Sequence, residues 1–212
     1  MAATNFSTMK LTIQSMVNRG NGALTNIGES IVAAIRFYER KQFWFNETYT
    51  ESLTLAQGDS SVALSSLSYP FKKAFLTRVS VNSQWRGAGT GFEHVTFKKL
   101  KNEIFTNPSS TGEPEYWAIL GNTLYVDKAA DQAYTLSMGY VYGDTILPSA
   151  DGDTSIWFDE ARELIKYRAA GLFYQDYLHA EEKAQFYFGK ADEWINNLII
   201  DNNTRESSWE LE

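Results

Sequence analysis

Phe43–Leu55 reads FWFNETYTESLTL, and in this stretch the spacing of the apolar residues changes. Before it, residues 27–38 repeat apolar side chains at about every 3.6 positions, as on one face of a helix. The stretch itself carries apolar side chains at odd positions, with polar residues at the even positions 46, 48, 50, 52 and 54: Phe43, Phe45, Tyr49, Leu53 and Leu55. A period of two is typical of a half-buried strand, so the sequence predicts that a helix gives way to a β module near residue 43.

The β module continues to about Tyr142. Its clearest part is the pair Tyr116–Leu120 and Leu124–Val126, because Gly121, Asn122 and Thr123 between them favour a tight turn. Further strands are expected at residues 62–64, 75–82, 92–97 and 134–142. Five to seven short strands separated by polar turns are typical of an antiparallel sandwich or a partly open barrel.

Helices are expected on both sides of this module. A first helix starts near Met9 with Thr8 as its cap, and a second runs to about Lys41 with Asn26 as its cap and Glu29 in the capping-box position. After Pro148, residues 153–155 favour a helix start, and two helical segments follow, with Trp157 and Trp194 on their apolar faces. The helical period is lost after Ile200, which predicts a mobile tail.

The predicted fold class is therefore α+β, with N- and C-terminal helices packed as a bundle and an inserted antiparallel β-sandwich or barrel-like module. The expected domains are 1–42 plus 150–200 for the helices, 43–149 for the β module and 201–212 for the tail.

Composition narrows the function. The net charge of -7 argues against general nucleic-acid binding, which needs a basic face, and the chain has no cysteine for disulfides, thiolate metal sites or thiol catalysis. No stretch approaches the roughly 20 apolar residues of a membrane-spanning helix, and residues 1–21 lack a signal-peptide core, so we expect no membrane association and synthesis in the cytoplasm.

Two loops resemble ligand-binding motifs without completing them. Asp151–Ser155 begins like a calcium loop, but Ile156 stands where glycine is needed and Arg162 where a bidentate carboxylate is needed, so helix capping is the preferred interpretation. Gly87–Gly91 leads into a predicted strand, so no helix amino terminus is available to hold a phosphate.

Other polar residues favour no chemistry. His94 and His179 lack the neighbours of a catalytic triad, and the adjacent pair Glu181 and Glu182 is typical of a solvated helix face. The sequence therefore predicts no catalytic residue, no metal ligand and no cofactor, and the protein is not expected to be an enzyme.

The order of the segments resembles the head-to-tail adaptor subunits of tailed bacteriophages, over about residues 9–199. The resemblance lies in the strand entry Phe43–Glu47, in Gly112–Val126, where a proline precedes a strand, a turn and a second strand, in the strand Tyr134–Tyr142 and in the closing helix Trp157–Tyr177. One departure is Asp127–Ala130, where many such proteins have a turn containing proline.

The resemblance implies a structural subunit of the virion neck or tail. It implies a homo-oligomeric ring of twelve copies that binds the portal protein and a distal tail, nozzle or tube protein, with DNA passing through the lumen without specific binding. Catalytic residues and cofactors are not implied. The acidic balance is consistent with such a channel, because like charge lowers adhesion of phosphates.

Two pairs of residues are candidate contacts. Trp85 and Arg86 flank the glycine loop and offer interface anchors toward a neighbouring subunit, while Trp209 and Leu211 in the tail are candidates for docking into the portal, where adaptor subunits of this kind extend their carboxyl ends.

One alternative remains open. The aromatic residues on the strands could line a carbohydrate- or receptor-binding surface, although a place in the sheet core is favoured by their alternation with polar residues: Tyr116, Trp117, Tyr134, Tyr140 and Tyr142.

Overall fold

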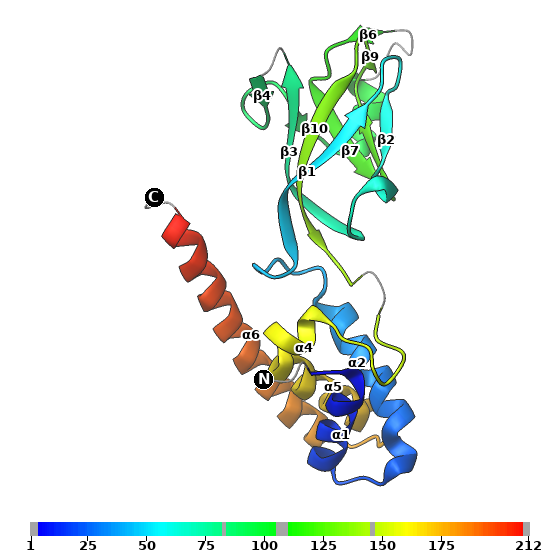
Figure 1. Cartoon of the computed structure of the whole chain (residues 1–212), viewed down its shortest axis with the longest axis vertical. Coiled ribbons are helices and arrows are strands. Elements are labelled where there is room, and N and C mark those ends of the chain that lie inside the picture. Colours follow the sequence, from blue (N-terminus) through cyan, green and yellow to red (C-terminus); the bar gives the residue numbers. More distant parts are fainter. Residues whose placement is uncertain (1–3, 82–83, 105–109, 145–146, 210–212) are drawn as a thin grey trace. The chain divides into compact units, whose positions relative to one another are not determined.

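The computed structural model describes residues 4–81, 84–104, 110–144 and 147–209. The chain divides into two compact units: residues 1–46 with 144–212, and residues 47–143. The first is helical and the second is built on curled, mainly antiparallel sheets, so the predicted α+β class is confirmed (Figure 1).

The helical unit contains helices from both ends of the chain. A short antiparallel bridge between Asn5 and Thr154 joins the two ends, next to hydrogen bonds from the N–H groups of Phe6 and Ser7 to the carbonyls of Asp153 and Asp151. The elements are α1 (Phe6–Val17), a 3₁₀ turn (Asn21–Ala23), α2 (Leu24–Tyr38), α4 (Ile156–Glu160), α5 (Arg162–Asp176) and α6 (Glu181–Trp209).

The helix starts differ from the predicted ones. α1 is capped by Asn5, whose Oδ1 accepts the N–H of Thr8 at 2.8 Å, so Thr8 is inside the helix and not its cap. α2 grows directly out of the 3₁₀ turn without a side-chain cap, and Asn26 lies within it. The predicted capping roles of Asn26 and Glu29 are therefore wrong, because the turn already supplies a start three residues earlier.

The predicted helix after residue 155 is two helices. Ser155 caps α4 by accepting the N–H of Trp157, and Ala161, with φ of -130°, separates α4 from α5. The backbone turns there while Trp157 stays fully buried, 6.1 Å from the ring centroid of Phe43 and 5.0 Å from that of Phe45. This aromatic group is part of one core that all the long helices of the unit share.

The end of α6 is the largest departure from expectation. The helix does not stop at Ile200 but continues to Trp209, so the expectation of a non-helical tail from Asp201 is wrong for residues 201–209. The tertiary reason is Asn202, which is buried and whose Oδ1 accepts the N–H of Trp44 at 2.9 Å.

Over its described residues, the β unit holds two four-stranded sheets and one small pair. One sheet has the order β1-β10-β3-β4, all antiparallel, and the other has the order β2-β8-β7-β5. The strands are β1 (Glu47–Leu55), β2 (Ser61–Ala63), β3 (Phe71–Val81), β4 (Gln84–Arg86), β5 (Glu93–His94), β6 (Thr111–Gly112), β7 (Tyr116–Leu120), β8 (Thr123–Val126), β9 (Ala129–Ala130) and β10 (Tyr134–Tyr142).

The predicted hairpin is confirmed as β7 and β8, with Gly121 at φ of 60° in the turn. The predicted strand at residues 92–97 is wrong for most of its length. Only β5 forms, paired in parallel with β7, because Thr96 caps a helical turn that continues as α3 (Phe97–Lys99) and the π-helical segment Leu100–Ile104.

Candidate interaction surfaces

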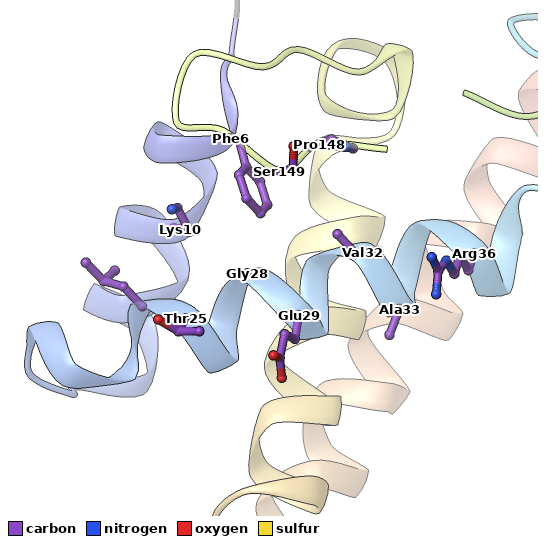
Figure 2. Close-up of a pocket in the computed structure, with 11 residues that line it drawn as sticks. Phe6, Lys10, Thr25, Gly28, Glu29, Val32, Ala33, Arg36, Pro148 and Ser149 are labelled. Atoms are coloured by element: carbon purple, nitrogen blue, oxygen red, sulfur yellow. The ribbon is translucent and has the colours of Figure 1, made fainter. Parts of the chain in front are cut away.

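A groove of about 610 Å³ crosses the helical unit between α1, α2 and the segment at Pro148 and Ser149. Figure 2 shows Phe6 and Lys10 at one side of it and four residues of α2 along its length: Glu29, Val32, Ala33 and Arg36. The floor of the groove is lined by the small apolar residues Gly28, Val32 and Ala33. Gly28 lets Phe6 pack closely on α2, because a Cβ there would lie 3.1 Å from the ring of Phe6.

Three charged side chains border this apolar floor. Lys10 pairs with Asp151 at 2.5 Å and lies 4.7 Å over the ring of Phe6, and the carboxylate of Glu29 accepts a hydrogen bond from the hydroxyl of Tyr177. Through that bond first and burial second, the pKa of Tyr177 is raised to about 12. Arg36 has no ion-pair partner among the residues that the structure describes, so the groove offers one free cation to a ligand or partner.

Large apolar side chains lie exposed on the helices. Phe186 and Ile200 on α6 are each 61% exposed, and Phe37 on α2 is 53% exposed. The predicted core position of Trp194 is wrong, because its side chain is 39% exposed. Exposed apolar side chains in this number are typical of surfaces that other chains cover.

Arg168 forms a second feature that the sequence did not reveal. Its guanidinium lies between two rings, 3.9 Å from the centroid of Phe37 and 4.5 Å from that of Phe188. Phe188 packs directly on Gly171, where a Cβ would come within 2.4 Å of the ring. These residues come from α2, α5 and α6, and no local sequence pattern joins them.

The candidates Trp85 and Arg86 lie on the edge strand β4, and they face different environments. Trp85 is 49% exposed and free to meet a partner. Arg86 pairs with Glu113 of its own chain, in a polar pocket of about 380 Å³ that also contains Glu115 and Lys128. Two lining residues, Glu115 and Tyr116, are held by the buried Asp127, whose carboxylate accepts their N–H groups.

The tail candidates are only partly described. Trp209 is the last residue of α6, and Leu211 lies outside the described residues. The segment that leads to them is firmly held, because the Arg205 guanidinium lies 4.3 Å over the ring of Trp44, beside the hydrogen bond of Asn202.

The loop Asp151–Ser155 has a structural role. The Asp153 carboxylate accepts the N–H groups of Ser149 and Ala150, which lowers its pKa, and Ser155 caps α4. Within the described ranges, no group of three or more His, Asp or Glu side chains is placed to hold a metal ion.

The two histidines belong to different units. His94 contacts Trp117, with ring centroids 4.5 Å apart, in the β unit. His179 takes a left-handed backbone, with φ of 48°, in the turn between α5 and α6 of the helical unit.

The strand tyrosines serve mainly as core. Tyr134, Tyr140 and Trp117 are buried, and Tyr116 and Tyr142 are half-buried. A continuous sugar-stacking platform of these five residues is therefore not formed. Tyr142 stacks on the exposed Tyr69, with ring centroids 4.5 Å apart.

None of the helices in the described part of the chain has the length and apolar character needed to span a bilayer. No curated protein matches the sequence. The model of one family, described as SU10 adaptor protein, matches residues 4–210 and so includes both units. The chain belongs to the SU10 adaptor protein family of phage head-tail adaptors.

Proposed function

We propose that this chain is one subunit of a ring of twelve copies that joins the portal protein to the distal tail, nozzle or tube protein, in the neck of a virion. The membership of the adaptor family carries the proposal. Physical support comes from the helical unit, whose outer faces carry large exposed apolar side chains such as Phe37 and Phe186. Exposing such side chains to water costs free energy, and their burial in a contact between subunits regains it.

In this ring the genomic DNA passes through the lumen without specific binding. The net charge of -7 supports this part, because an acidic wall repels phosphates and does not retain them. The subunits are made in the host cytoplasm and function in the assembled particle.

The contact with the portal is assigned to the end of the chain, residues 201–212, with Trp209 and Leu211 as anchors. Two contacts support this assignment: Asn202 and Arg205 fix the direction of the last turns of α6 by holding on to Trp44. A held helix end presents its terminal residues with little loss of conformational entropy.

A neighbouring subunit or tail component covers Trp85, while Arg86 is retained by its own Glu113. Trp is the residue type most enriched in interface anchors, and Trp85 lies on an edge strand. Hydrogen exchange of residues 84–91 before and after assembly tests this contact, and equal exchange would contradict it.

The ring is tested by size-exclusion chromatography with light scattering, on the protein alone and after mixing with portal particles of the same phage. We expect a high-mass complex with the portal, in a ratio that electron microscopy resolves as twelve-fold. A wild-type chain that stays monomeric in both samples would overturn the proposal.

The tail assignment has its own test. Deletion of residues 206–212 keeps Asn202 and Arg205, so the helical unit keeps the contacts at Trp44. We expect this variant to melt like the full chain and to lose recruitment to portal particles. Full recruitment of the folded variant would leave the tail without a docking role.

A further inference from the structure

The groove on α2 and the outer face of α6 are complementary in shape and charge. The groove offers an apolar floor at Val32 and Ala33 between two charges, Glu29 and Arg36. Those two charges lie about 10.5 Å apart along the helix axis, at 1.5 Å per residue. A partner that fits must bring a bulky apolar side chain flanked by a cation and an anion at a similar spacing.

The outer face of α6 has this arrangement around Phe186. Glu182 and Lys190 lie one turn before and one turn after Phe186, on the same face of the helix, and about 12 Å apart along its axis. Phe186 is the most exposed aromatic side chain among the described residues, at 61%. The spacings of the two charge pairs differ by about 1.5 Å, which long side chains absorb.

The signs of the charges select one direction. With the helices antiparallel, Glu182 meets Arg36, Lys190 meets Glu29, and Phe186 lies over Val32 and Ala33 between them. With the helices parallel, Glu182 would meet Glu29 and Lys190 would meet Arg36, and like charges in a closed contact are unfavourable.

A third pair extends the antiparallel register. Glu193 lies one turn beyond Lys190 on the same face of α6, toward the end of the groove where Lys10 lies. Lys10 lines the groove next to Gly28, where a Cβ would lie 3.4 Å from its Cδ. In the free chain Glu193 pairs with Lys190 at 2.9 Å, and Lys10 pairs with the exposed Asp151.

One chain cannot make this contact with itself. α2 and α6 both pack against α5 through their buried faces, so the groove and the Phe186 face both point away from the shared core. The contact therefore needs two copies. Because the two surfaces differ, each copy keeps one of each free for the next copy, which is the head-to-tail arrangement that closes a ring.

We infer that the outer face of α6 around Phe186 docks antiparallel into the α2 groove of a second copy of this chain. This inference rests on the proposed ring and names the surfaces that build it. Arg36, which lacks a partner in the described chain, then gains the carboxylate of Glu182.

Cysteine cross-linking tests the register without interference, because the chain has no cysteine of its own. Arg36→Cys and Glu182→Cys are made in separate chains, mixed, assembled on portal particles and oxidised. We expect a covalent dimer in high yield. The matched control is Arg36→Cys with Glu193→Cys, which lie about three turns apart in the antiparallel register but close in a parallel one, and should give little dimer.

Substitutions provide a second readout. Phe186→Ala should weaken association between copies about tenfold or more, as is usual for an aromatic anchor, while Ile200→Ala, equally exposed but outside the groove register, should not. Arg36→Glu and Glu182→Arg should each weaken assembly. A mixture of the two variants should restore it, because every contact between unlike variants then pairs opposite charges at positions 36 and 182. Thermal melting of each monomer serves as the folding control.

The outcomes separate the inference from the proposed function. Full assembly of Phe186→Ala, or rings in which Arg36→Cys and Glu182→Cys do not cross-link, would overturn the contact and leave the ring standing. A wild-type chain that never associates with itself or with portal particles would overturn the ring and this contact together.

Discussion

The backbone N–H of Trp44 donates a hydrogen bond of 2.9 Å to Oδ1 of Asn202, across 158 positions of sequence. The bond joins the segment after α2 to the last third of α6. Arg205 reinforces it from one turn further on, through its position over the Trp44 ring. The end of α6 is therefore a packed part of the helical unit as far as these residues.

Asn202→Ala should loosen this end of the helix. The substitution leaves the N–H of Trp44 without its acceptor, which costs about 1 to 3 kcal/mol of unfolding free energy. Urea unfolding measures the loss, and hydrogen exchange should rise in residues 198–209 first. The matched control is the exposed neighbour Asn203→Ala, for which we expect a change below about 0.5 kcal/mol. Equal stability of the two variants would contradict the role of Asn202.

Trp157→Ala should destabilise the helical unit strongly. The side chain is 0% exposed and contacts both Phe43 and Phe45, so its removal leaves a large cavity and should cost about 3 to 5 kcal/mol. Trp194→Ala is the control of the same chemistry, and its partial exposure limits the expected loss to about 1 kcal/mol. Chemical denaturation of both variants checks the contrast, which similar losses would refute.

Gly171→Ala should disturb the stack on Arg168. The new methyl group would lie 2.4 Å from the Phe188 ring, so Phe188 must move away from the guanidinium, at a cost of about 1 to 3 kcal/mol. Gly189→Ala, on α6 with no atom near its Cβ, should instead be neutral or stabilising. Thermal melting compares the two. If both alanine variants gained stability, the close packing of Phe188 on Gly171 would be disproved.

Tyr177 should make the helical unit sensitive to high pH. Its pKa is raised to about 12 in the folded chain by the bond to Glu29, above the ordinary value of 10.0. The neutral hydroxyl thus contributes stability that is fully present below pH 10 and is lost as the pH rises from about 10 to 12. The contribution is modest, because Tyr177 is partly exposed.

Tyr177→Phe is the variant that isolates this effect. It should unfold more easily than wild type at pH 8, and the difference should shrink as the pH approaches 12, since only the wild type then loses the bond. Melting temperatures at several pH values check the slope. A constant difference across this range would show that the bond to Glu29 does not stabilise the fold.

The periodic parts of the fold were predictable because their signals are local. The spacing of Ile27, Ile31 and Ile35 marks one buried face of α2, and Gly121 marks the turn between β7 and β8. Cap positions were less predictable, since Asn5 and Thr8 are both good caps within three positions and tertiary contacts decide between them.

The end of α6 and the interaction surfaces lay beyond sequence reasoning. Residues 201–205 are polar, and what keeps them helical is Trp44, far away in sequence. The groove is built by Phe6, Val32 and Pro148, from three separate segments.

The β unit enters on β1 and leaves on β10, and these strands are direct neighbours, with Glu47 opposite Val141. Its two ends are therefore about 5 Å apart, the separation of paired strands. A few residues could bridge residues 46 and 144 if the unit were removed, and a foreign domain with adjacent ends could take its place. The β unit is thus exchangeable, which lets evolution or an engineer replace it while the helical unit keeps its sequence.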